Sequence, residues 1–123
     1  MNGINLLIDT NIALYLLNGN KSLIGVLNRK NLFVSFISEL ELLGYKNISE
    51  KEKRTIQNFL NDCTIIDCSS EIKITTINLK QKYNIKLPDA LIAATAKVMN
   101  MTLLSADTGF NQIQEIDFQL FNP

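Results

Sequence analysis

The segment that most constrains the fold is residues 87–99, a nearly unbroken run of small and apolar residues that begins Leu-Pro-Asp. Proline suits the first turn of a helix, because the N–H group it lacks would have no partner there. From Ala90 to Met99 the run has no wide polar face, so we expect a helix buried on most sides. Asp89 then starts a buried helix, where the helix dipole alone would favour an acid by ~0.3–1 kcal/mol.

Length and composition predict one globular domain over residues 1–123. Hydrophobic residues make up 46% of the chain and charged residues 20%, a balance typical of chains that fold around a core. No apolar run approaches the ~20 residues of a membrane span, and the start lacks the basic region of a signal peptide. We therefore expect a cytoplasmic protein with no membrane partner.

The residue types that are absent or rare exclude several chemistries. The chain has no histidine, which excludes His-based acid–base catalysis, Ser–His and Cys–His nucleophile pairs, and His-ligated zinc. Its two cysteines, Cys63 and Cys68, flank a predicted strand and would lie ~16 Å apart, too far for a disulfide. Catalysis would have to use carboxylates, hydroxyls, lysines or arginines.

Short apolar runs alternate with helical patterns along the whole chain. Strands are expected at residues 4–8, 32–35, 64–67, 102–105 and, as an edge strand, 118–121. Helices are expected at residues 12–17, 22–28, 39–43 (capped by Ser38), 49–60, 70–83 and 87–99, with a short turn at 110–113. This order predicts an α/β fold: a central, mostly parallel sheet of about five strands flanked by helices.

Four acidic residues fall at one predicted edge of that sheet. Asp9 and Asp107 follow strands, whereas Glu41 and Asp89 lie near the starts of helices that follow or precede strands. Carboxylates that meet at this edge repel one another, and a divalent cation offsets the repulsion. Oxygen ligands without His or Cys favour Mg²⁺ or Mn²⁺. The matching reaction is hydrolysis of a phosphodiester, in which the metal lowers the pKa of the attacking water.

Four segments carry a resemblance to a known family. In order they are Asp-Thr-Asn at 9–11, SFISELEL at 35–42, LPDALIAA at 87–94 and LLSADTGF at 103–110. Together they resemble the four blocks of PIN-domain nucleases, and among these the VapC-type toxins of bacterial toxin–antitoxin pairs. The resemblance implies a Mg²⁺- or Mn²⁺-dependent endoribonuclease with a PIN-like fold, an RNA substrate, a homodimer and a cognate antitoxin.

The resemblance also implies roles for individual residues. Asp9 and Asp89 would be the principal metal ligands. Asp107 would complete the metal set, and Glu41 would act with it in the catalytic acidic cluster, through the metal or its waters. Supporting hydrogen bonds would come from three further residues: Thr10, Asn11 and Ser105.

The choice of Glu41 over Glu39 rests on spacing. The two glutamates are two residues apart on one helix and so cannot share a face. The family's spacing favours Glu41 in the site and leaves Glu39 in solvent. An alternative is a capping box, in which Glu41 binds back to the N–H of Ser38.

Other interpretations of the acids stay open. Asp9 and Asp107 could each simply begin a turn. Asp67, at the end of the third strand, would suit a phosphoacceptor receiver domain, although no lysine follows Lys97. The fold could also serve as a binding module without catalysis, or as a nuclease for RNA processing or repair.

The balance of charge fits a nuclease in one respect. Assigning four of the twelve acids to the site leaves eight acids against twelve Lys and Arg residues, an excess of four positive charges elsewhere. Phosphate contacts to RNA could then come from Arg29, Lys30, Lys46 or Lys86.

Overall fold

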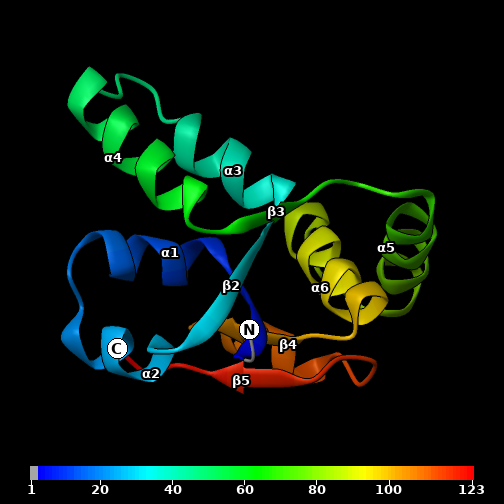
Figure 1. Cartoon of the computed structure of the whole chain (residues 1–123). Coiled ribbons are helices and arrows are strands. Elements are labelled where there is room, and N and C mark those ends of the chain that lie inside the picture. Colours follow the sequence, from blue (N-terminus) through cyan, green and yellow to red (C-terminus); the bar gives the residue numbers. More distant parts are fainter. Residues whose placement is uncertain (1–2) are drawn as a thin grey trace.

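A five-stranded sheet forms the centre of the computed structural model, which describes residues 3–123 (Figure 1). All neighbouring strands are parallel, and their order is β3-β2-β1-β4-β5. The strands are β1 (Ile4–Ile8), β2 (Lys30–Ser35), β3 (Thr64–Ile66), β4 (Thr102–Ser105) and β5 (Phe118–Leu120). The predicted α/β fold with a five-stranded sheet is confirmed, and the sheet is parallel throughout.

Six α-helices and one 3₁₀ helix connect and flank these strands. They are α1 (Thr10–Leu17), α2 (Lys21–Leu27), α3 (Phe36–Leu43), α4 (Glu50–Asn61), α5 (Ser70–Lys82), α6 (Leu87–Met99) and η1 (Thr108–Gln112). In the part of the chain that the structure describes, no helix combines the length and apolar character needed to cross a bilayer.

The strand order changes direction at β1. From β1 the chain proceeds outward through β2 and β3, and then returns to place β4 on the other side of β1. Leu6 of β1 accordingly pairs with Leu32 on one side and Thr102 on the other. In open α/β sheets, ligands bind outside the carboxyl ends of the strands at such a switch point. Receiver domains have the order 2-1-3-4-5, so the observed order excludes that alternative.

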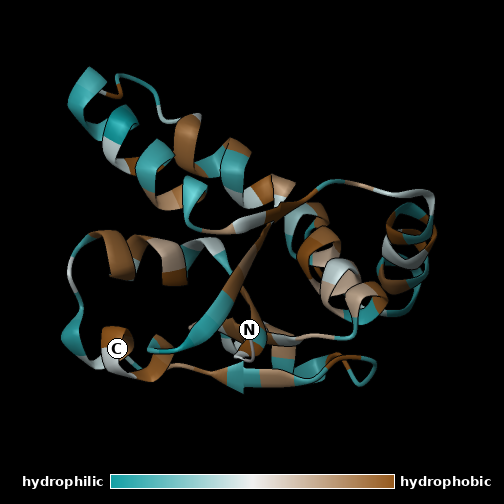
Figure 2. Ribbon diagram, viewed as in Figure 1, coloured by the Kyte–Doolittle hydropathy of each residue, from teal (hydrophilic) through white to brown (hydrophobic). Residues whose placement is uncertain are grey.

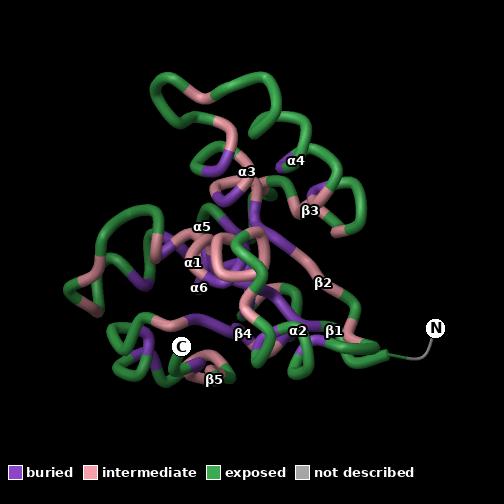
Figure 3. The backbone as a smooth tube through the Cα atoms, turned by 90° about the vertical axis from the view of Figure 1, so that its left-hand side faces the viewer, coloured by how far each residue is buried: buried purple, intermediate pink, exposed green. Residues whose placement is uncertain are grey.

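Each face of the sheet packs against its own set of helices. Leu6 and Ile8 of β1 join a core with residues of α1, α2 and α4, whereas Leu7 joins a second core with residues of α5 and α6. Strands covered on both faces must be apolar at successive positions, which explains the run of apolar residues in β1. Figure 3 shows the buried stretches of β1 and β4 in the middle of the molecule.

The helix α6 is buried as its sequence predicts, and its ribbon is more hydrophobic than the largely hydrophilic ribbon of α4 (Figure 2). Five consecutive residues of α6, from Ile92 to Ala96, are buried. In α4 only Ile56 and Leu60 are buried, and most other positions are hydrophilic. The helix α5 is intermediate in burial between α6 and α4. Two of its isoleucines, Ile74 and Ile77, are exposed.

Two local predictions can be compared directly with the structure. Ser38 does not cap α3, because the helix begins earlier. Ser35 is the N-cap, and its hydroxyl accepts a hydrogen bond from the N–H of Ile37 at 3.2 Å. Cys63 and Cys68 are free thiols, as predicted.

Candidate active site

Asp9 follows β1 directly and begins α1. Its extended backbone leaves the strand, and its carboxylate oxygen Oδ1 accepts a hydrogen bond from the N–H of Thr10 at 2.8 Å. The side chain therefore caps the helix, which agrees with the alternative interpretation that Asp9 simply begins a turn. However, only 6% of Asp9 is exposed, and a buried carboxylate needs more compensation than one backbone N–H supplies.

The second carboxylate oxygen of Asp9, Oδ2, accepts hydrogen bonds from residues that follow β1 and end β4. Ser105, at the end of β4, donates its hydroxyl to Oδ2 at 2.7 Å, and the Asn11 amide donates to the same atom at 3.3 Å. Asn11 in turn accepts the N–H of Ala106 at 3.2 Å, and Ser105 accepts the N–H of Asp107 at 3.0 Å. The two supporting residues thus tie the end of β1 to the end of β4.

Thr10 connects Glu41 to the same edge. Its hydroxyl lies 2.5 Å from Oε1 of Glu41 and 2.9 Å from the hydroxyl oxygen of Ser38. One hydroxyl has one hydrogen to donate, so Thr10 can donate to Glu41 while it accepts from Ser38. Glu41 makes this tertiary contact instead of the capping box considered above.

Glu39 lies elsewhere on α3. It is half-buried rather than free in solvent, and it lines a recess with Gln57 and Asn58 of α4. The structure therefore brings Glu41, and not Glu39, to the end of β1.

Asp89 and Asp107 occupy the more open side of the edge. Asp89 lies half-buried in the first turn of α6, and Asp107 is an exposed N-cap of η1 that accepts the N–H of Gly109 at 2.8 Å. Both acids line a cavity of about 250 Å³ together with Lys86.

The charges of the four acids act on one another. Burial is the main cause that raises the pKa of Asp9, and the charges of Glu41 and Asp107 raise it further. Burial also raises the pKa of Asp89, and Asp9, Asp107 and Glu41 add to this effect, whereas Lys86 opposes it. Charge effects of this kind act over several ångströms, so they indicate that the four acids lie in the same region at the carboxyl edge of the sheet.

The donor set fits a hard divalent cation. Within residues 3–123, no Lys or Arg forms an ion pair with any of the four acids, and Asp9 has only neutral hydrogen-bond donors. In the same range, no three acidic or cysteine side chains are arranged as a complete set of ligands for one ion. Mg²⁺ commonly binds only one or two carboxylates and keeps several waters, so it does not require a complete set of protein ligands.

Some residues of this region were missed by sequence reasoning. Ser38 was assigned only a capping role, yet it is buried against Thr10. Asn84 and Gln112 line the cavity beside Asp89 and Asp107, and no sequence pattern marks them. Among the four candidate RNA-binding basic residues, Lys86 lines this cavity. Lys30 instead starts β2, at the opposite end of the strand from the acids, and Arg29 precedes it.

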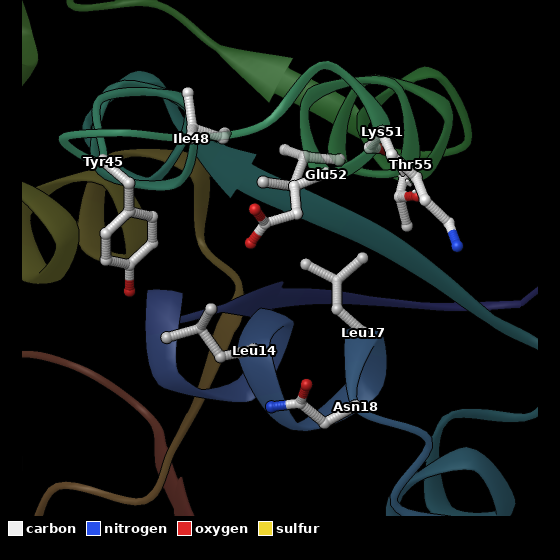
Figure 4. Close-up of a pocket in the computed structure, with 9 residues that line it drawn as sticks. Leu14, Leu17, Asn18, Tyr45, Ile48, Lys51, Glu52 and Thr55 are labelled. Atoms are coloured by element: carbon white, nitrogen blue, oxygen red, sulfur yellow. Dashed lines mark hydrogen bonds between the residues drawn. The ribbon is translucent and has the colours of Figure 1, made fainter.

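A second, apolar groove of about 400 Å³ lies between α1 and α4 (Figure 4). Leu14 and Leu17 of α1 form one wall, and Ile48 and Ile56 lie on the opposite side. Tyr45, which is 53% exposed, stands at one end of the groove. No acid of the candidate site lines this groove, so it is separate from the cavity beside Asp89 and Asp107 and differs from it in chemistry.

Comparisons with known proteins agree with the fold. A family model described as "PIN domain" matches residues 6–116. A search of curated proteins gave no match.

Solved structures match over nearly the full chain. A chain of VapBC2 from Rickettsia felis, bound to a DNA fragment from its promoter, has a TM-score of 0.83 and 24% identity, and the match covers 97% of this chain and 100% of that one. A chain of a toxin–antitoxin complex from Klebsiella pneumoniae has a TM-score of 0.78 and 30% identity, with coverage of 90% and 94%. VapBC-1 from Haemophilus influenzae gives 0.79 and 24%, with coverage of 95% and 98%. The chain belongs to the PIN domain family.

Proposed function

We propose that the protein is a Mg²⁺- or Mn²⁺-dependent endoribonuclease and the toxin of a toxin–antitoxin pair. The observation that carries the proposal is the buried carboxylate of Asp9, which has no basic partner in residues 3–123 and lies among three other acids at the switch point. Burying a carboxylate beside like charges is unfavourable, so a cation that offsets the charges explains why the arrangement persists.

Asp9 and Asp89 would be the principal metal ligands, with Asp107 completing the set and Glu41 acting beside it. When bound, the metal supplies positive charge that offsets the carboxylates and the charge that develops on the phosphate oxygens during hydrolysis. Ser105 and Asn11 orient the Asp9 carboxylate through hydrogen bonds of 2.7 and 3.3 Å, and Thr10 holds Glu41. Such supporting contacts fix the direction in which each ligand oxygen points.

A cognate antitoxin is the proposed protein partner. Support comes from the relative of 30% identity, which was solved as a toxin–antitoxin complex. We assign the apolar groove between α1 and α4 to an apolar segment of that antitoxin, since leucine and isoleucine side chains line it on both sides. A homodimer, on the basis of the family resemblance, and the cytoplasmic location expected from the sequence complete the proposal.

The test is cleavage of single-stranded RNA by the full chain with Mg²⁺ or Mn²⁺. We expect cleavage that stops with EDTA and in Asp9→Asn. A matched control is Asp67→Asn, because Asp67 is exposed and follows β3 at the same sheet edge; this variant should cleave like the wild type. Failure of the wild type to cleave with either metal would contradict the proposal and favour a non-catalytic binding module. Cleavage of DNA in preference to RNA would favour a repair role.

A further inference from the structure

The cavity beside Asp89 and Asp107 has features that the acidic cluster does not use. At about 250 Å³, it is smaller than the ~300–1,000 Å³ pockets that enclose drug-sized ligands, and it suits one ring system. The acids lie on part of its wall, and Asn84, Lys86 and Gln112 supply amide and ammonium groups on the rest. A group bound here would sit directly beside the carboxylates.

Two chain segments form the walls of the cavity, and hydrogen bonds hold these segments together. The residues before α6 form one wall, and η1 forms the other. Just outside the cavity, the hydroxyl of Tyr83 donates to Oε1 of Glu115 at 2.6 Å and accepts the N–H of Gln114 at 3.2 Å. Lys82 adds an ion pair to Glu115 at 3.1 Å. The spacing of the walls is therefore set by the fold before any ligand arrives.

The polar groups of the walls are available for a ligand. Among residues 3–123, neither the Asn84 nor the Gln112 side-chain amide takes part in a hydrogen bond, and both residues are exposed. Each amide offers both donors and an acceptor, which is the combination that pairs with the edge of a nucleobase. Ile85 contributes apolar surface. Phe110 is only 2% exposed, so it forms the floor of the cavity and offers no face for stacking.

The charge of Lys86, together with those of the two acids, determines how a nucleotide would be oriented in the cavity. Asp89 and Asp107 repel phosphate unless a cation is present, whereas the ammonium group of Lys86, which lines the same cavity, attracts it. A neutral base is the part of a nucleotide that can enter the cavity without repulsion. A flanking phosphate can meanwhile remain near Lys86.

We propose that this cavity is the subsite for the nucleobase next to the scissile phosphate, with Asn84 and Gln112 reading the base edge and Lys86 contacting a flanking phosphate. The inference rests on the proposed nuclease function. It makes the enzyme selective for the base at one position of single-stranded RNA and tolerant at positions outside the cavity.

The first experiment digests a random-sequence single-stranded RNA pool and sequences the fragment ends. We expect a base preference at one position beside the cut, which Asn84→Ala and Gln112→Ala each reduce by about twofold to tenfold, the effect of losing one hydrogen bond. Gln57→Ala, an amide in the recess beside Glu39, is the matched control and should leave the preference unchanged. Lys86→Gln should lower cleavage of all sequences alike and reduce the salt dependence. Cleavage with a preference that neither amide variant changes would overturn the inference while the nuclease function stands.

A second experiment separates the two proposals if no RNA is cleaved. The side-chain amide NMR signals of Asn84 and Gln112 in the full chain are followed during titration with each of the four 5′-mononucleotides and Mg²⁺. Shifts of these signals that differ among the bases, with the Gln57 signal unmoved, would support the subsite even though the nuclease function had failed. The absence of shifts with all four nucleotides would overturn the subsite.

Discussion

The two aspartates whose pKa values are raised by burial have opposite surroundings. Asp9 accepts hydrogen bonds from Thr10, Asn11 and Ser105 and belongs to the connection between β1 and β4. Asp89 is half-buried on the wall of a cavity, and within residues 3–123 its carboxylate accepts no hydrogen bond. One acid is thus part of the framework of the fold, whereas the other has no hydrogen-bond partner in the part of the chain that the structure describes. Substitution of Asp9 should therefore lower stability, whereas substitution of Asp89 should raise it.

The largest effect is expected for Asp9→Asn. Loss of a charged ligand should lower RNA cleavage on the order of 10²–10³-fold, because metal-ion catalysis contributes several kcal/mol. The variant should also be less stable in urea, since an amide cannot accept hydrogen bonds on both atoms as the Asp9 carboxylate does. An Asp9→Asn protein as stable as the wild type would remove the distinction between the two aspartates.

Ser105→Ala tests the framework without removing an acid. The Asp9 carboxylate would lose its 2.7 Å hydrogen bond, at a cost to the free energy of unfolding of about 1.5–3 kcal/mol. Cleavage should fall about 10–100-fold, as is usual when a supporting contact to a metal ligand is lost. Ser22→Ala, on the exposed surface of α2, serves as the control in both urea denaturation and cleavage. Unchanged cleavage in Ser105→Ala would mean that the orientation of Asp9 does not matter.

Asp89→Asn should raise the melting temperature of the metal-free protein by a few degrees. A raised carboxyl pKa means that the folded state binds the proton more tightly than the unfolded state, so stability falls as pH rises through the folded pKa. Removing the charge of Asp89 removes this loss and relieves its repulsion of Asp9. The same variant should gain less from Mn²⁺ than the wild type, measured by thermal melting. A lower melting temperature, with no Mn²⁺ effect in either protein, would make Asp89 a simple helix-end residue.

The smallest effect is expected for Tyr83→Phe, which lies outside the acidic cluster. It removes the hydrogen bond to Glu115 and should cost about 0.5–1.5 kcal/mol of unfolding free energy. The Tyr83 hydroxyl is also the main cause that lowers the pKa of Glu115, so the wild type loses this stabilisation as pH falls below about 4–5. Urea denaturation at several pH values should show a weaker acid dependence in the variant. An identical pH dependence in both proteins would contradict the assigned role of this contact.

Sequence reasoning located the acids because their positions depend on simple rules. Apolar runs mark β1 and β4, parallel strands align their carboxyl ends, and Asp9 and Asp107 follow those ends. The start of β2 was less predictable. Lys30 and Asn31 are polar, and they join the strand through pairing with Ile4 and Asn5 rather than through their own preferences.

Features that depend on tertiary contacts could not be predicted from the sequence. Ser38 is a plausible helix cap by local pattern, whereas in the structure Ser35 is the N-cap and Ser38 lies inside the helix, buried against Thr10. Asn84 and Gln112 lie 28 positions apart and carry no shared signal. The packing of η1 beside the start of α6 brings them into one cavity.

The hydrogen bond between Asp9 and Ser105 also has a consequence for synthesis. Its two residues are separated by 96 positions, so β4 must leave the ribosome before they can meet. Chains grow at about 5–20 residues per second, and the first helices can form while β4 is still missing. A nascent chain therefore carries Asp9 without its Ser105 partner and without Asp107. The cluster of four acids therefore stays incomplete until β4 and Asp107 have been translated.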